Sequence, residues 1–223
     1  MKINFLFYFL LCSGSLIAQE KQIDWPNLSK YAISNDTMHK TDEMVVFIGN
    51  SITEIWPQVM PKYFKENNFI GRGISGQTSP QVLLRFRNDV VNLGPKAVVI
   101  NIGINDIAEN TGPYNEEFVL NNISSMVEIA LANDIQVILA SVLPASSFPW
   151  RPEIENVAQK VIDLNKGIKG IANAYSVQYL NYYDTLKNDK GGLDPSMAED
   201  GVHPTEKCYL IMSELALNAL YNL

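Results

Sequence analysis

The stretch Val45-Val46-Phe47-Ile48-Gly49-Asn50-Ser51-Ile52-Thr53-Glu54 decides the fold of this chain. Four apolar residues lead directly into a glycine, and a segment of helical character follows. A short apolar run that ends at a glycine is typical of a buried strand in a parallel sheet. Ser51 then lies at the carboxyl end of that strand, where open α/β sheets bind their ligands. Its hydroxyl is either a nucleophile or the N-cap of the next helix, and this stretch alone favours the cap.

Apolar runs and helical patterns alternate along the rest of the chain. We expect five strands, at residues 44–48, 69–70, 97–102, 136–143 and 177–180. The expected helices cover residues 52–64, with a break at Pro57 and Pro61, and residues 79–93, 116–133, 153–174 and 205–221. This alternation predicts an α/β fold with three α/β/α layers around a five-stranded parallel sheet. The expected winding is flavodoxin-like, with strand order 2-1-3-4-5.

The composition is that of a folded domain. Of the 223 residues, 47% are hydrophobic and 18% are charged, which excludes a disordered chain. The formal net charge is −7, and Lys and Arg form no block. This balance argues against nucleic acid and anionic membrane surfaces as partners. After the N-terminal segment, no stretch reaches the roughly 18 consecutive apolar residues of a membrane-spanning helix. The sequence does not predict an oligomeric state.

Residues 1–18 have the three parts of an export signal. Lys2 stands at the start, residues 5–11 are apolar, and Ala18 precedes a polar segment. We expect cleavage after Ala18 and a periplasmic or secreted protein, with lipidation of Cys12 as the alternative. Residues 19–43 then form a polar N-terminal arm, and residues 44–223 form one domain. Without Cys12, Cys208 has no disulfide partner, and its apolar surroundings predict a buried thiol.

Residues with catalytic potential follow several of the expected strands. Ser51 follows the first strand, Gly76 the second and Asn105 the third, while Asp200 and His203 come after the fifth. The segments that follow parallel strands share one edge of the sheet. These five residues can therefore meet, although they span about two thirds of the chain.

His203 lies in the segment Asp200-Gly201-Val202-His203-Pro204. A carboxylate three residues before an imidazole can turn back and accept a hydrogen bond from Nδ1–H, which leaves Nε2 free to act as a base. A capping or core role is the alternative for His203. A metal site is a further alternative, but the only other histidine, His39, lies in the polar arm, and no Cys pair exists.

Gly76 and Asn105 also have two interpretations. Both residue types are ordinary in turns. Alternatively, the Gly76 backbone N–H and the Asn105 side-chain amide join the Ser51 backbone N–H around an oxyanion. Loss of one such donor typically costs roughly 3–4 kcal/mol of transition-state stabilisation.

Four segments together resemble the SGNH hydrolases, also called GDSL-type esterases and lipases. They are Gly49-Asn50-Ser51-Ile52-Thr53, Gly73-Ile74-Ser75-Gly76-Gln77-Thr78, Gly103-Ile104-Asn105-Asp106 and Asp200-Gly201-Val202-His203-Pro204. Their order matches the family's first, second, third and fifth blocks, and the resemblance covers the chain from Val45 to the last helix. The sequence departs from the family pattern at Asn50 and Gln77, where Asp is frequent, and at Ile104, where a smaller residue is common.

The resemblance implies an esterase mechanism. Ser51 would be the nucleophile, His203 the base and Asp200 its orienting carboxylate. Ser51, Gly76 and Asn105 would form the oxyanion hole, and the reaction needs neither metal nor organic cofactor. We expect an exported enzyme that hydrolyses short-chain esters, with acetyl esters of small molecules or glycans as the first choice of substrate.

The aromatic side chains suggest where a sugar would bind. Trp56, Phe148 and Trp150 could form a wall on which a sugar ring stacks, and we assign substrate binding to Phe148 and Trp150. Core or loop packing is the alternative for all three rings. The alternative functions are a lysophospholipase or thioesterase of the same fold, or a glycan-binding module without turnover.

Overall fold

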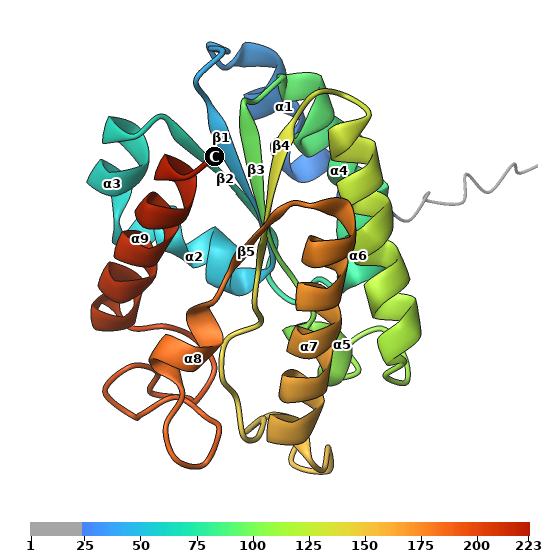
Figure 1. Ribbon diagram of the computed structural model, residues 1–223, viewed down its shortest axis with the longest axis vertical. Coiled ribbons are helices and arrows are strands. Elements are labelled where there is room, and N and C mark those ends of the chain that lie inside the picture. Colours follow the sequence, from blue (N-terminus) through green and yellow to red (C-terminus); the bar gives the residue numbers. More distant parts are fainter. Residues whose placement is uncertain (1–23) are drawn as a thin grey trace, which may run out of the picture.

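The computed structural model describes residues 24–223 and contains a five-stranded parallel sheet with the order β2-β1-β3-β4-β5 (Figure 1). The strands are β1 (Val45–Gly49), β2 (Phe69–Gly73), β3 (Ala97–Asn101), β4 (Gln136–Ala140) and β5 (Gln178–Leu180). The predicted fold class and strand order are therefore confirmed. The expected signal peptide at residues 1–18 and the alternative at Cys12 lie outside the described residues.

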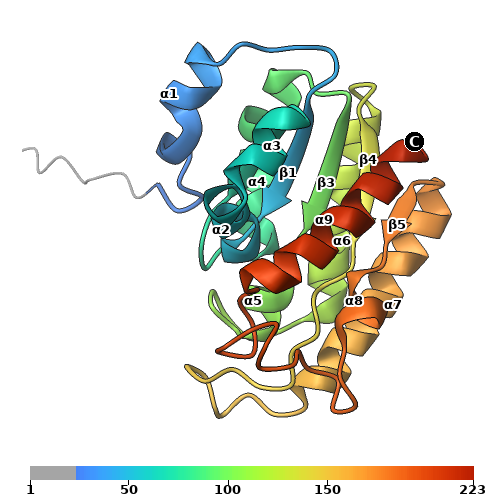
Figure 2. The same ribbon diagram turned by 90° about the vertical axis from the view of Figure 1, so that its left-hand side faces the viewer.

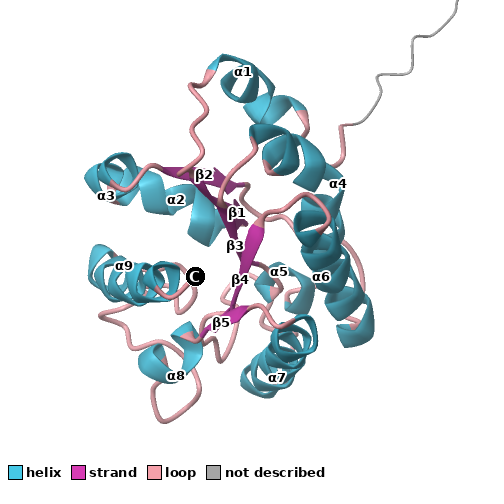
Figure 3. Cartoon of the chain, turned by 45° about the horizontal axis from the view of Figure 1, so that its top comes forward, coloured by secondary structure: helices cyan, strands magenta, loops and turns pink. Residues whose placement is uncertain are grey.

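Helices cover both faces of the sheet (Figure 3). They are α1 (Ser29–Thr37), α2 (Ser51–Val59), α3 (Pro61–Glu66), α4 (Ser79–Asp89), the 3₁₀ turn η1 (Val91–Leu93), α5 (Ile104–Ile107), α6 (Glu116–Leu131), α7 (Val157–Tyr175), α8 (Tyr182–Leu186) and α9 (Glu206–Tyr221). One layer holds α4, α5, α6 and α7, and the other holds α2, α3, α8 and α9. Figure 2 shows α9 crossing the sheet on the same side as α2 and α3.

The expected element boundaries need small corrections. Pro57 lies inside α2, and the break falls at Met60, so that Pro61 opens α3. Thr78 rather than Ser79 caps α4, through a capping box with Gln81. The polar arm also contains α1, which its sequence does not predict because no apolar stripe marks it.

Two glycines allow α2 to pack directly on the ends of β1 and β2. A Cβ atom added to Gly73 would lie 2.1 Å from the Glu54 backbone nitrogen, and one added to Gly49 would lie 2.5 Å from Thr53 Oγ1, and both neighbours belong to α2. The register pairs Gly49 with both Gly73 and Asn101. The first turn of α2 therefore sits against the carboxyl edge of the sheet, where Ser51 is placed.

The fully buried guanidinium of Arg85, in α4, stabilises this edge of the sheet. Arg85 donates to the Gly49 carbonyl at 2.9 Å, to the Arg72 carbonyl at 2.8 Å and to Gln77 Oε1 at 2.6 Å. It also pairs with Asp89 at 2.8 Å. These contacts join β1, β2 and the loop after β2, so Arg85 fixes the three segments relative to one another.

Two further features of the described residues concern the thiol and the membrane. Cys208 is a buried free thiol, as expected. None of the helices in residues 24–223 has the length and apolar character needed to cross a bilayer.

Candidate active site

Ser51 is the first residue of α2. The cap of this helix is Asn50, whose side-chain oxygen accepts from the Ile52 amide at 3.1 Å. The interpretation of Ser51 as the N-cap is therefore wrong. Because Asn50 supplies the cap, the Ser51 hydroxyl is free for other contacts.

The structure brings Ser51 and His203 together although 152 positions separate them in the sequence. Ser51 Oγ lies 2.9 Å from His203 Nε2, and His203 Nδ1 lies 2.6 Å from Asp200 Oδ2. His39, the other histidine, is exposed on the segment after α1 and makes no contact with this group. The hydroxyl, imidazole and carboxylate form one continuous chain of hydrogen bonds, an arrangement in which the imidazole can take the hydroxyl proton.

Asp200 is fixed by the turn that it starts. Its Oδ1 accepts from the backbone amides of Val202 at 2.9 Å and His203 at 2.8 Å, and its Oδ2 faces the imidazole. Partial burial raises the pKa of Asp200, but these hydrogen bonds lower it more, so the net shift is downward. The carboxylate stays ionised at neutral pH and favours the tautomer with a proton on Nδ1.

Gly76 and Asn105 both lie beside Ser51 and line the same cleft. Gly76 has a φ of +77°, in the left-handed region that suits glycine. Asn105 is buried at the start of α5, and its Nδ2 donates to the Gln77 carbonyl at 3.0 Å. A side-chain amide has two N–H groups, so one remains for a ligand. The structure thus gathers all five residues that the sequence singled out.

Glu54 was not identified from the sequence. It lies one helical turn after Ser51, and its Oε2 accepts from the Ser75 amide at 2.5 Å and the Ser75 hydroxyl at 2.6 Å. Its Oε1 pairs with Lys30 of α1. Burial raises the pKa of Glu54, but the contacts with Lys30 and Ser75 outweigh that effect and lower it. Glu54 therefore ties the residue before Gly76 to the helix that starts with Ser51.

Asn110 is a second site residue that the sequence does not predict. Its Nδ2 donates to the Gly76 carbonyl at 3.0 Å and so restrains the peptide that follows Gly76. The only local signal is its position a few residues after Asn105, in a loop that reads as an ordinary turn. Its contact with Gly76 spans 34 positions and is visible only in the folded chain.

A cleft of about 370 Å³ opens above Ser51. The lining residues are Ser51, Ile55, Ser75, Gly76, Asn105, Asn110, Trp150 and His203. The Trp150 side chain is 43% exposed, and its ring centroid lies 6.1 Å from that of His203. Trp150 is therefore available to a ligand in the cleft.

The expected roles of two other aromatic rings need correction. Phe148 is 1% exposed and packs behind Trp150 at a centroid distance of 5.4 Å, so it supports the wall but cannot touch a ligand. Trp56 is buried within an aromatic cluster with Phe47 and Tyr209. Both apolar rings are removed from water by core packing, which their sequence positions alone do not predict.

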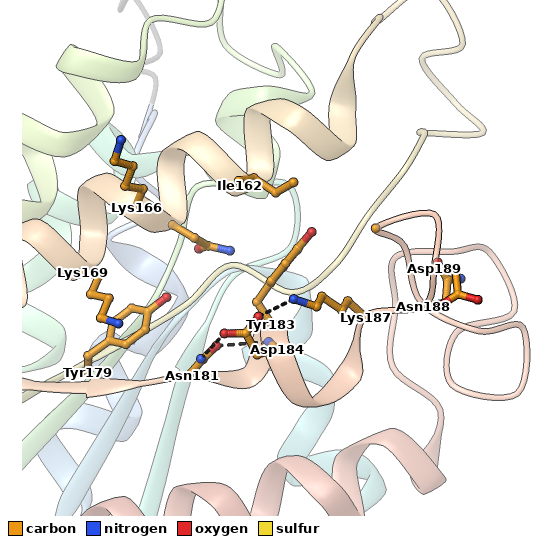
Figure 4. A pocket seen from close by; sticks show the side chains of 12 residues that line it. Ile162, Lys166, Lys169, Tyr179, Asn181, Tyr183, Asp184, Lys187, Asn188 and Asp189 are labelled. Carbon is orange, nitrogen blue, oxygen red and sulfur yellow. Dashed lines mark hydrogen bonds and ion pairs between the residues drawn. The ribbon is translucent and has the colours of Figure 1, made fainter.

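A larger hollow in the described residues lies elsewhere. It measures about 610 Å³ and is formed by α7, β5, α8 and the loop after α8 (Figure 4). It contains none of the Ser51, His203 and Asp200 side chains. Chemistry rather than size therefore marks the smaller cleft as the candidate active site.

Residues 47–211 match the model of the GDSL-like lipase/acylhydrolase family. The chain belongs to this family. The match spans the elements from β1 into α9 and includes every residue of the candidate site. No curated protein sequence matches the chain significantly.

Solved structures of this family support the assignment. A GDSL-like lipase from Bacteroides thetaiotaomicron is 49% identical, with a TM-score of 0.87 over 89% of this chain and 98% of the other. A protein from Bacteroides fragilis is 47% identical, with a TM-score of 0.88 over 90% and 99% of the two chains. An acetylxylan esterase from Geobacillus stearothermophilus is 20% identical, with a TM-score of 0.63 over 81% and 94%, and is a likeness of fold.

Two departures from the family pattern have a local explanation. Asn50 keeps the capping oxygen that an Asp would offer, so the start of α2 is preserved. Gln77 accepts from Arg85 and donates to the Pro26 carbonyl at 2.7 Å, which joins the loop after β2 to the N-terminal arm. Neither substitution removes a group that contacts Ser51 Oγ or His203.

Proposed function

We propose that the protein is an exported serine esterase that hydrolyses short-chain esters, with acetyl esters of carbohydrates as the preferred substrates. The observation that carries this proposal is the Ser51–His203–Asp200 chain of hydrogen bonds at the floor of an open cleft. Membership of the GDSL-like lipase/acylhydrolase family supports ester hydrolysis.

The mechanism begins with attack of Ser51 Oγ on the ester carbonyl carbon. His203 Nε2 takes the hydroxyl proton, and Asp200 stabilises the imidazolium through Nδ1–H. The tetrahedral intermediate collapses when the imidazolium protonates the departing alcohol, which leaves an acyl-serine. His203 then activates a water molecule, whose attack releases the carboxylic acid and restores Ser51.

The oxyanion of each tetrahedral intermediate would be held by three donors. They are the Ser51 amide at the start of α2, the Gly76 amide and the free N–H of Asn105. The start of α2 adds its helix dipole, which favours negative charge at that position. Fixed donors of this kind favour the transition state because they need no reorganisation when charge develops.

The cleft favours a small acyl group. Its lining holds only two large apolar side chains, Ile55 and Trp150, and its other residues are small or polar. A long acyl chain needs an extended apolar channel in which to leave water, and this cleft would bury little of it. The cleft therefore disfavours the substrates of a lysophospholipase or a long-chain thioesterase. The exposed Trp150 ring suits the apolar face of a sugar.

A series of p-nitrophenyl esters tests the proposal. We expect acetate to be hydrolysed with a higher kcat/KM than octanoate, and an acetylated polysaccharide to release acetate. Ser51→Ala should abolish both reactions while leaving the melting temperature unchanged. Undiminished hydrolysis by Ser51→Ala would falsify the assignment of Ser51 as the nucleophile. A preference for octanoate would favour a lysophospholipase or thioesterase instead.

A further inference from the structure

The 610 Å³ hollow has the features of a binding site of its own, which we call the lysine–tyrosine pocket. One wall is a single face of α7, where Ile162, Asn165, Lys166 and Lys169 recur at helical spacing. The opposite wall comes from the end of β5 and from α8. A volume of this size accommodates a small ligand or one or two units of a polymer.

Aromatic rings and ammonium groups lie together in this pocket. Lys169 Nζ lies 5.9 Å from the ring centroid of Tyr179, and Lys187 Nζ lies 5.4 Å from that of Tyr183. Figure 4 shows these pairs on the two sides of Asn181 and Asp184. Rings beside cations offer both a face for stacking and a positive charge for an anion.

Two carboxylates line the pocket, and they lie away from Lys166: Asp189 belongs to the loop after α8, and Asp184 is already paired (Figure 4). Asp184 Oδ1 lies 2.5 Å from Lys187 Nζ, and Asp184 Oδ2 accepts from Asn181 at 2.6 Å. Within the described residues, no carboxylate lies within ion-pair distance of Lys166 or Lys169. In a chain with a net charge of −7, these two lysines form a local positive area open to an anionic ligand.

The rim of the pocket is held in shape by one side chain. Asn188 Oδ1 accepts from the amides of Lys190 at 2.9 Å and Gly192 at 3.1 Å, and Asn188 Nδ2 donates to the Leu193 carbonyl at 3.1 Å. Gly191 has a φ of +74°, and a Cβ there would lie 3.3 Å from the Tyr183 hydroxyl. The loop is therefore built in advance of any ligand, which reduces the entropic cost of binding.

The same rim touches the loop that carries Trp150. A Cβ added to Gly192 would lie 2.9 Å from Ser146 Oγ, four positions before Trp150. The loop that leads to Trp150 of the candidate active site thus packs against the rim of the lysine–tyrosine pocket. A ligand that occupies both would have to be an extended molecule.

We propose that the lysine–tyrosine pocket binds a uronic acid unit of an acidic polysaccharide. The sugar ring stacks on Tyr179, and its carboxylate pairs with Lys169, with Lys166 adding to the attraction. The proposal rests on the proposed function, because it names the polymer whose acetyl esters would reach Ser51. Binding at this pocket is a separate property that can be measured without turnover.

The test is isothermal titration of the protein with unesterified tetragalacturonate, which carries no ester to hydrolyse. We expect saturable binding that weakens with added salt. The double variant Lys166→Gln/Lys169→Gln should bind about tenfold or more weakly, because it removes both ammonium groups that attract the carboxylate. Tyr179→Ala should weaken binding through loss of stacking. Lys65→Gln, an exposed lysine on α3, is the matched control and should bind as the wild type does.

Four results would overturn the proposal. They are no heat of binding at millimolar tetragalacturonate, equal binding of neutral xylotetraose, displacement of tetragalacturonate by an equal concentration of inorganic phosphate, and unchanged affinity in the double lysine variant. Ser51→Ala should bind tetragalacturonate normally. If the protein hydrolyses p-nitrophenyl acetate but fails the binding test, the pocket proposal is wrong while the esterase proposal stands.

Discussion

Replacement of Glu54 by Gln probes how the loop after β2 is held beside the nucleophile. Glu54 accepts two hydrogen bonds from Ser75 and pairs with Lys30, and its side chain is 19% exposed. Gln keeps the length of the side chain but has one acceptor oxygen and no charge. It cannot hold the Ser75 amide, the Ser75 hydroxyl and Lys30 at once. Gly76, the next residue, should then be held less firmly.

The size of the effect follows from these contacts. Hydrogen bonds to a charged group contribute roughly 1.5–3 kcal/mol, and full loss of one oxyanion donor costs about 2.7–4 kcal/mol. Because Gly76 stays restrained by Asn110, we expect a partial loss. The predicted fall in kcat for Glu54→Gln is about 10–100-fold, equivalent to about 1.4–2.7 kcal/mol. KM should change by less than about threefold, since the lost contact acts on the transition state.

The assay is steady-state hydrolysis of p-nitrophenyl acetate, with the melting temperature measured in parallel. Ser75→Ala removes only the hydroxyl contact and keeps the amide contact, so its kcat should fall much less. Glu43→Gln is the matched control, because Glu43 is exposed and pairs with Lys96 at the surface, away from Ser51. The reasoning is refuted if Glu54→Gln retains wild-type kcat, or if its loss of activity is no larger than its loss of folded protein.

Three further predictions concern other buried or paired groups. Asp200→Asn should lower kcat by about 10³–10⁴-fold, because His203 loses the carboxylate that fixes its tautomer. Arg85→Met should lower the unfolding free energy in urea by about 3–5 kcal/mol, because it leaves Asp89 as an unpaired buried charge. Burial raises the pKa of Asp106 from 3.8 to about 6. The folded state therefore holds this proton to higher pH than the unfolded state, and stability should fall as the pH rises from about 4 to about 6. In Asp106→Asn, the urea midpoint should show no such fall between pH 4.5 and pH 7. If the midpoint of the variant changes with pH as much as that of the wild type, the prediction is wrong.

Much of the fold was predictable because its signals are local. The apolar runs before Gly49 and before Gly103 mark buried strands, and the spacing between them leaves room for crossover helices. Parallel strands joined in this way admit few arrangements, so the order of the sheet followed from the alternation of elements. The sequence did not predict helix α1, because this helix has no apolar stripe. Polar contacts hold it in place, such as the hydrogen bond from the Tyr31 hydroxyl to the Gly73 carbonyl.

The sequence predicted the five candidate residues of the site but not the side chains that hold them in place. Ser51, Gly76, Asn105 and the Asp200–His203 turn each follow a strand, and that position carries the prediction. Glu54 and Asn110 act through contacts across 21 and 34 positions, which no local pattern encodes. The burial of Phe148 likewise depends on what packs around its loop.

The amino-acid sequence by itself determined the parallel α/β architecture, its strand order and the edge at which the polar groups gather, because periodicity and chain connectivity are properties of neighbouring residues. Only the tertiary structure decided that Ser51 Oγ lies 2.9 Å from His203 Nε2, that Trp150 faces the cleft while Phe148 does not, and that a second pocket opens beside α7. Distances and exposure of this kind depend on how distant segments pack, and packing is a property of the whole chain.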